Sequence, residues 1–223
     1  MPQSPLSRYR ELVDAGSVTE DAAQLEAVRA FDALWKQLQT PNNKGLTQRL
    51  RRRPPEPVPG LYVWGSVGRG KTWLMDLFFD SLPEQGKTRI HFHRFMQRVH
   101  WYLARLGHRR DPLPRIADEW ARDGRILCLD EFFVSDIADA MLLGGLLEAL
   151  FRNGVTLVTT SNVEPGELYR DGLQRAKFLP AIDLLRRHTR VLHLAEQHAD
   201  EIRADGGEVA VFACDVGERS QAV

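Results

Sequence analysis

The sequence has few cysteines, no net charge and no long apolar run, and each absence excludes a class of protein. Only two of its 223 residues, Cys128 and Cys214, are cysteines, too few for a disulfide framework or a zinc site. Thirty basic residues balance thirty acidic ones, so charge argues for neither a nucleic-acid coat nor an acidic partner. No apolar run approaches the roughly 18–20 residues of a membrane span, and residues 1–16 lack a signal-peptide core. We therefore expect a soluble, cytoplasmic protein.

Length and apolar content fit one large domain with appended segments. Hydrophobic residues make up 43% of the chain, which supports a sizeable core. Residues 1–40 carry an apolar stripe that predicts an N-terminal helical segment, with a helix start near Thr19–Asp21. The stripe consists of Leu25, Val28, Phe31, Leu34, Trp35 and Leu38. Residues 41–59 hold five prolines and no periodic pattern, so we expect a linker or surface loop there.

From residue 60 onward, short β-rich runs alternate with longer helical patterns. Strands are expected near residues 61–65, 88–93, 125–130, 155–160 and 190–194. Helices are expected over residues 71–81, 94–106, 113–123, 136–152 and 178–188. This alternation is typical of a parallel sheet covered on both faces. The fold class is therefore α/β, with a core spanning residues 60–194.

The most specific feature is a glycine-rich run between the first strand and the helix after it. The run fills every fixed position of the pattern GxxxxGK[ST] with Gly65, Ser66, Val67, Gly68, Arg69, Gly70, Lys71 and Thr72. Between a strand and a helix, the backbone N–H groups of such a loop and the helix N-terminus bind phosphate. Lys71 would reach the β- and γ-phosphates, and the Thr72 hydroxyl would coordinate Mg²⁺. The flanking strand and helix argue against a chance match, so we expect a bound nucleoside triphosphate.

Two adjacent carboxylates follow the apolar run 126–129. Asp130, at the strand end, would face the metal ion, usually through water. Glu131 faces the other way and can polarise a water molecule in line with the γ-phosphate. Phosphoryl transfer needs such positioning and charge neutralisation more than covalent chemistry. The Asp–Glu pair alone is weak evidence, but behind a phosphate-binding loop it becomes strong.

The strand near 155–160 also turns polar at its carboxyl end. Open α/β sheets bind ligands at that edge, so Asn162 would lie near the γ-phosphate and the attacking water. An asparagine that only caps the turn before Pro165 is the alternative. In residues 168–180, an arginine could reach the nucleotide of a neighbouring copy and stabilise transition-state charge. A surface salt bridge is the alternative for any single arginine there.

Three histidines, His91, His93 and His100, invite a metal-site hypothesis, because His91 and His93 would share one strand face. However, nothing supplies a carboxylate or thiolate at ligand spacing. A histidine that is hydrogen-bonded near the active-site end of its strand is the preferred interpretation.

Together these segments resemble the AAA+ ATPases of the ZapE type, bacterial cell-division proteins related to mitochondrial Afg-one-like ATPases. The resemblance covers about residues 8–194 and rests on Gly60–Thr72, Ile90–His100, Cys128–Met141, Thr160–Asn162 and Leu168–Ile182. It implies a P-loop NTPase three-layer αβα sandwich with a five-stranded parallel sheet of order 5-1-4-3-2. It also implies ATP and Mg²⁺ as cofactors, with Thr72 and Asp130 at the metal. Catalytic roles fall to Glu131, Asn162 and an arginine finger, for which Arg175 is the first choice and Arg170 the second.

The resemblance further implies a homo-oligomer with a shared active site that acts in cell division on the FtsZ ring. Family members continue after the fifth strand with a helical lid. Residues 195–223 are instead rich in Asp, Gly and Glu, so we expect a divergent or truncated tail and no lid. The alternatives are a nucleotide-gated adaptor with little hydrolysis and a helicase-loader-like module, although the neutral charge gives nucleic-acid binding no support.

Overall fold

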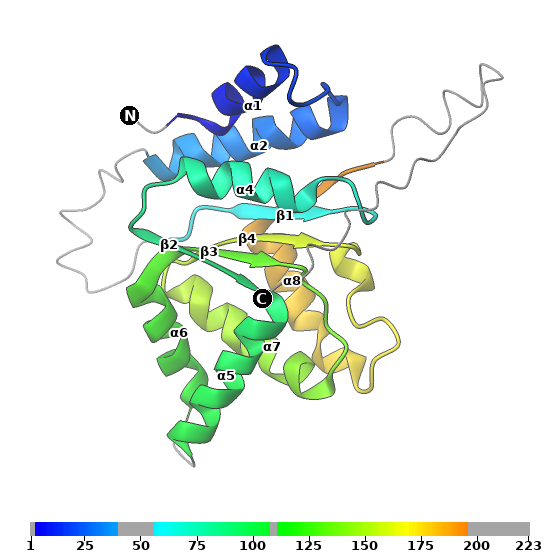
Figure 1. Ribbon diagram of the computed structural model, residues 1–223. Coiled ribbons are helices and arrows are strands. Elements are labelled where there is room, and N and C mark those ends of the chain that lie inside the picture. Colours follow the sequence, from blue (N-terminus) through cyan, green and yellow to red (C-terminus); the bar gives the residue numbers. More distant parts are fainter. Residues whose placement is uncertain (1–2, 40–55, 108–110, 196–223) are drawn as a thin grey trace, which may run out of the picture.

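The core of the protein is a five-stranded, fully parallel β-sheet. The computed structural model describes residues 3–39, 56–107 and 111–195, which are coloured in Figure 1. The strands are β1 (Gly60–Trp64), β2 (Gly86–His91), β3 (Gly124–Asp130), β4 (Thr156–Ser161) and β5 (Thr189–His193). Their spatial order is β2-β3-β4-β1-β5, and every neighbouring pair is parallel. This confirms the expected order 5-1-4-3-2, which counts the same strands from the opposite edge.

Helices cover both faces of the sheet. Successive strand residues point to opposite faces and are therefore buried in two different apolar cores. In β1, Leu61 and Val63 belong to one core and Tyr62 to the other. Figure 1 shows α1, α2 and α4 on one side of the sheet and α5 to α8 on the other. The helices are α1 (Pro5–Asp14), α2 (Ala22–Gln39), α4 (Lys71–Ser81), α5 (Phe92–Leu106), α6 (Pro112–Asp123), α7 (Ile137–Arg152) and α8 (Leu179–His188).

The apolar stripe in the N-terminal segment forms the buried face of α2. Phe31 lies against Phe78 of α4 with 5.1 Å between the ring centroids, and Trp35 Nε1 donates a 2.7 Å hydrogen bond to the Ser81 carbonyl. Asp21 Oδ1 accepts a 2.8 Å hydrogen bond from the Gln24 amide, which caps α2 close to the predicted start. The stripe therefore holds the N-terminal helices against α4.

The boundary between β2 and α5 corrects one prediction. The strand expected over 88–93 ends at His91, and α5 begins at Phe92 rather than at residue 94. His93 therefore lies in a helix and does not share a strand face with His91. The reason is packing, because the buried residues Phe92, Phe95, Met96 and Val99 have helical spacing.

Two predicted segments lie largely outside the described residues. Residues 56–59 lead into β1 without regular structure, but residues 40–55 and 196–223 are not described. The Pro-rich linker, the lidless tail and the division of the chain at residues 40, 59 and 194 stay predictions. None of the described helices has both the length and the apolar character that crossing a membrane requires.

Candidate active site

The glycine-rich loop joins β1 to α4, and its glycines are needed for backbone conformation at two positions and for space at a third. Gly68 and Gly70 have φ values of +85° and +78°, a region that favours glycine because it has no Cβ. A Cβ at Gly65 would lie 2.6 Å from the Leu194 carbonyl oxygen, and one at Gly70 would lie 3.3 Å from Gln24 Nε2. The loop therefore passes close to the end of β5 on one side and to the first turn of α2 on the other.

Lys71 is buried and turned back onto its own loop. Its Nζ donates hydrogen bonds of 2.8 Å and 2.7 Å to the carbonyl oxygens of Gly65 and Ser66. Burial lowers the pKa of Lys71, and the nearby Arg69 guanidinium lowers it further. Phosphate oxygens would reverse this shift, because they would place negative charge beside the ammonium group. Thr72, the next residue, is exposed at the start of α4.

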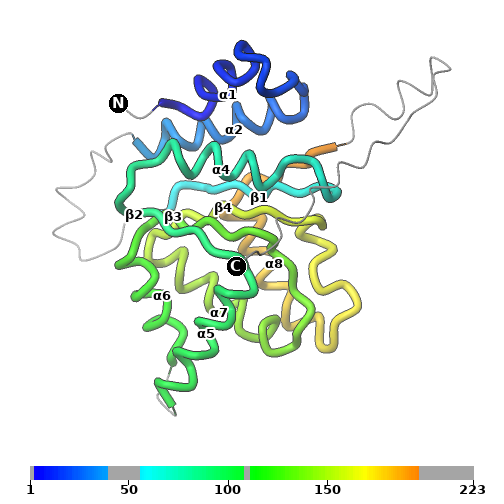
Figure 2. Tube along the Cα trace, in the orientation of Figure 1, coloured from blue at the N-terminus to red at the C-terminus, as the bar shows by residue number. Residues whose placement is uncertain are grey.

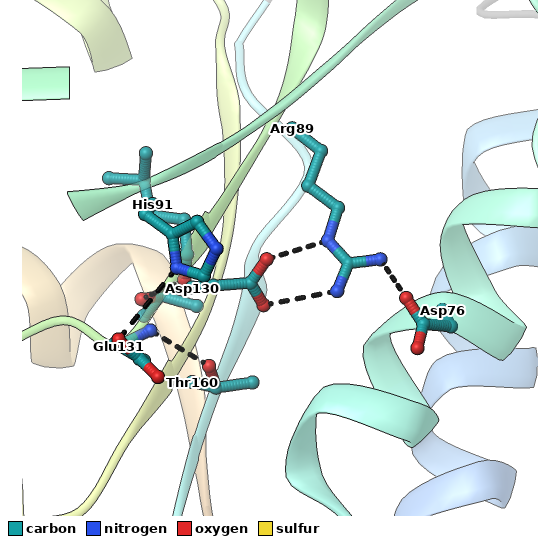
Figure 3. Close-up of polar contacts among 8 residues, drawn as sticks. Asp76, Arg89, His91, Asp130, Glu131 and Thr160 are labelled. Atoms are coloured by element: carbon teal, nitrogen blue, oxygen red, sulfur yellow. Dashed lines mark hydrogen bonds and ion pairs between the residues drawn. The ribbon is translucent and has the colours of Figure 1, made fainter. Parts of the chain in front are cut away.

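The predicted metal ligand Asp130 and the predicted catalytic residue Glu131 point in different directions, as Figure 3 shows. The Asp130 side chain is 5% exposed and accepts hydrogen bonds of 2.6 Å from Arg89 Nε and 3.4 Å from Arg89 Nη2. The Glu131 side chain is 73% exposed, and its Oε2 lies 3.8 Å from His91 Nδ1. One carboxylate is thus held in the interior while its neighbour faces solvent.

Glu131 owes this direction to its backbone. Its φ is +56°, a left-handed conformation that is uncommon for residues other than glycine. Thr160 at the end of β4 supports the turn, since its Oγ1 accepts a 3.1 Å hydrogen bond from the Glu131 amide. The Thr160 carbonyl accepts a 2.7 Å bond from the Phe132 amide. A residue in an uncommon backbone conformation that neighbours hold in place is typical of functional sites.

Most of the predicted site residues meet at one cleft at the carboxyl edge of the sheet. Figure 2 shows that the loops after β1, β3 and β4 leave the same end of the sheet. The cleft has a volume of ≈ 420 Å³. Its lining consists of Val67, Gly68, Gly70, Lys71, Thr72, Trp73, Glu131, Thr160, Ser161 and Asn162. The structure thus brings Lys71, Thr72, Glu131 and Asn162 together around one space.

The remaining loop residues and Asp130 are not part of this lining. Gly65 lies beneath the loop, where its amide donates a 3.3 Å hydrogen bond to the Ser161 carbonyl. Arg69 Nη2 donates a 2.6 Å bond to the carbonyl of Ala195, just after β5. Asp130 is buried at the end of β3, where its carboxylate pairs with Arg89.

The matched protein family agrees with this geometry. A model of the family described as AFG1-like ATPase matches residues 3–204. This chain belongs to the AFG1-like ATPase family. The cell division protein ZapE of Escherichia coli K12 is 51% identical over 203 residues, which are 86% of this chain and 54% of that protein. The chain therefore spans about half the length of this relative.

Solved structures of lower identity share the fold of this AFG1-like ATPase. A crystal structure of DnaI superposes with a TM-score of 0.54 at 17% identity, covering 81% of this chain and 86% of that one. AMPPCP-bound DnaA from Aquifex aeolicus superposes with a TM-score of 0.53 at 12% identity, covering 87% and 56%. At such identities the comparison concerns the arrangement of helices and strands alone.

The predicted arginine finger of this AFG1-like ATPase does not face the cleft. Arg175 is half-buried in the connection between β4 and α8. Its Nε donates a 3.1 Å hydrogen bond to the Tyr169 carbonyl, and its Nη2 donates to the Gly166 carbonyl. Arg170, the second choice, is exposed and paired with Glu167 at 2.7 Å. Both arginines have partners within their own loop.

Oxygen donors in the cleft lining and at the end of β3 fit a magnesium ion. The Thr72 hydroxyl and the Asp130 carboxylate are the hard oxygen ligands that Mg²⁺ prefers. The bonds from Arg89 leave the Asp130 oxygens with further lone pairs for bound water. Among residues 3–39, 56–107 and 111–195, no group of three or more His, Cys, Asp or Glu residues could hold a metal. His100 instead pairs with Asp139 at 2.7 Å.

Sequence reasoning assigned no role to Thr160, Arg89 or Asp76. Thr160 stands in an apolar strand where a threonine is unremarkable, and its contact with Glu131 depends on β3 and β4 pairing. Arg89 reaches Asp130 only because β2 lies beside β3, with Arg89 opposite Cys128. For Arg89, the available signal was a charged residue in the middle of a predicted strand.

Replacing Thr160 by valine keeps the shape of the side chain and removes the oxygen that accepts from the Glu131 amide. We expect a loss of about 1 kcal/mol in the free energy of unfolding and faster hydrogen exchange at the Glu131 amide. Thr159→Val is the matched control, because Thr159 Oγ1 donates to the Leu129 carbonyl at 2.8 Å instead. Urea unfolding and amide exchange measure both effects. Equal exchange at Glu131 in the two variants would contradict this role of Thr160.

Proposed function

We propose that this chain binds ATP with Mg²⁺ in the cleft beside the glycine-rich loop and hydrolyses it to ADP and phosphate. The observation that carries the proposal is the meeting of Lys71, Thr72, Glu131 and Asn162 around one space. Membership of the AFG1-like ATPase family supports it. We also propose that the sheet and the helices on its two sides form the three-layer αβα core of an AAA+ protein.

Phosphate binding would fall to the loop and to the start of α4. The backbone N–H groups of residues 65–70 and the positive end of the helix dipole favour an anion there. The Lys71 ammonium would leave the carbonyls of Gly65 and Ser66 for the β- and γ-phosphates. Thr72 would bind Mg²⁺ directly, and Asp130 would do so through water. The cation, when bound, neutralises charge that develops on the phosphate oxygens.

Hydrolysis requires an oriented water molecule, and Glu131 is our choice to orient it. The water oxygen forms a bond to the γ-phosphorus while the bond to the β–γ bridging oxygen breaks, and Glu131 accepts the proton. The exposed side chain of Glu131 faces the cleft from a backbone that Thr160 holds in place. Asn162, on the same rim, would hydrogen-bond the γ-phosphate or the water.

We further propose a role in cell division, with the FtsZ ring as partner and a homo-oligomer as the working form. The similarity to the E. coli protein named cell division protein ZapE supports this role. In the oligomer, Arg175 of one copy would approach the γ-phosphate of the next. It would first have to exchange its bonds to Tyr169 and Gly166 for the phosphate.

Lys71→Ala should abolish ATP binding, because the β- and γ-phosphates would lose the ammonium group proposed to bind them. Calorimetric titration with ATP and Mg²⁺ measures the affinity. Lys177→Ala, an exposed lysine outside the cleft, is the control and should bind as the wild type does. Unchanged ATP affinity in Lys71→Ala would place the nucleotide elsewhere.

Glu131→Gln should leave ATP binding intact and lower turnover by about 10³-fold or more, because an amide cannot take the proton from water. Single-turnover hydrolysis is the measurement, and Glu148→Gln on the exposed surface of α7 is the control. Unchanged hydrolysis in Glu131→Gln would mean that another group orients the water. A wild-type chain that binds ATP without turnover at any protein concentration would favour the nucleotide-gated adaptor.

Arg175→Ala should leave ATP binding intact and reduce turnover, since loss of an arginine finger typically costs about 10³–10⁵ in rate. Mixing Arg175→Ala protein with Glu131→Gln protein tests whether the site is shared. In a mixed oligomer, an intact Glu131 from one copy can meet an intact Arg175 from its neighbour, so some activity should return. No recovery in an assembly shown to be mixed would contradict a shared site.

A further inference from the structure

Arg89 lies between two carboxylates that come from different elements of the site, as Figure 3 shows. From β2, it forms a two-pronged contact with Asp130 at the end of β3, at 2.6 Å and 3.4 Å. Its Nη1 pairs with Asp76 of α4. The side chains of Arg89, Asp130 and Asp76 are 18%, 5% and 49% exposed. A single guanidinium therefore bridges β3 and α4.

The helix end of this bridge lies next to the proposed metal ligand. Asp76 follows Thr72 by four residues on α4, so the two side chains lie one turn apart on the same helical face. The other end holds Asp130 through both oxygens, which fixes the plane of the carboxylate as well as its position. Arg89 thus connects the two elements that carry Thr72 and Asp130.

We propose that Arg89 is a positioning residue that fixes Asp130 relative to Thr72 and so sets the affinity for Mg²⁺ bound with nucleotide. The inference rests on the proposed function of the cleft. Partners of this kind orient metal-binding carboxylates, and their loss typically lowers metal affinity by about 10–100-fold. Arginine suits the task better than lysine, because its planar fork binds two acceptors in a defined geometry.

A purely structural link between β2 and α4 would respond differently to Mg²⁺, and Lys87 provides the comparison. Lys87 lies two residues earlier on β2, on the same face, and is also buried. Its Nζ donates bonds of 2.9 Å and 3.1 Å to the carbonyls of Phe79 and Leu82, at the far end of α4. Lys87 therefore joins the same strand to the same helix at a point away from Asp130.

The experiment compares ATP affinity in Mg²⁺ with ATP affinity in EDTA by calorimetry, for wild type, Arg89→Met, Asp76→Leu and Lys87→Met. In Arg89→Met, the gain in affinity from Mg²⁺ should fall by about 10–100-fold, while affinity in EDTA stays at the wild-type level. Asp76→Leu should also lose part of the gain, because it detaches the bridge from α4 and leaves Asp130 paired. Lys87→Met should lower thermal stability and keep the full gain.

Three results would overturn the inference. The first is an unchanged gain in Arg89→Met, and the second is a larger gain, which would mean that Arg89 competes with the cation. The third is an unchanged gain in ATP affinity from Mg²⁺ in Asp76→Leu. This result would mean that Arg89 only neutralises the charge of Asp130 and does not position it relative to α4. Asp76→Leu also carries the test if Arg89→Met does not fold. A wild-type chain that gains nothing from Mg²⁺ would instead overturn the proposed function, so the two failures are distinguishable.

Discussion

The end of β4 holds the candidate site together, because it makes backbone contacts with both of the loops that form the cleft. The Ser161 carbonyl accepts from the Gly65 amide at the base of the glycine-rich loop. One residue earlier, Thr160 accepts from the amides of Glu131 and Phe132 through its side chain and carbonyl. The Ser161 hydroxyl donates back to the Phe132 carbonyl at 2.8 Å. The parallel order that places β4 between β3 and β1 is therefore the condition for the cleft.

Three charged groups to which we assign roles in nucleotide binding or hydrolysis already have partners inside the protein. Lys71 is bonded to two loop carbonyls, Asp130 to Arg89, and Arg175 to the backbone of its own loop. Binding a nucleotide would then be an exchange of partners, in which each new bond is offset by one that is given up. The net gain of such an exchange would be small for each group, so the affinity for nucleotide would depend on several groups acting together.

The sequence predicted those parts of the site that follow from local pattern. The run from Gly65 to Thr72 has fixed spacing, and the polar residues after β3 and β4 stand at strand ends that any parallel sheet would align. The sheet order came from the family resemblance, because no local signal states which strands are neighbours. The boundary at His91 was misplaced because a short run of aromatic residues and histidines fits a strand as well as a first helical turn.

Contacts between distant residues were beyond local pattern. Arg89 and Asp130 are separated by 41 positions, and their pairing depends on the alignment of β2 with β3. The inward direction of Arg175 likewise depends on how its loop folds onto itself. These contacts depend on the tertiary structure, which hydrophobic periodicity and secondary-structure propensity along the sequence do not predict.

The glycine-rich loop is touched from both sides by segments that lead away from the core. Gln24 of α2 lies close to Gly70, and Arg69 binds the carbonyl of Ala195, the last described residue after β5. A loop that shifted on taking up phosphate would pull on both segments at once. The first turn of α2 and the segment just after β5 would therefore feel any change that phosphate binding causes in the loop.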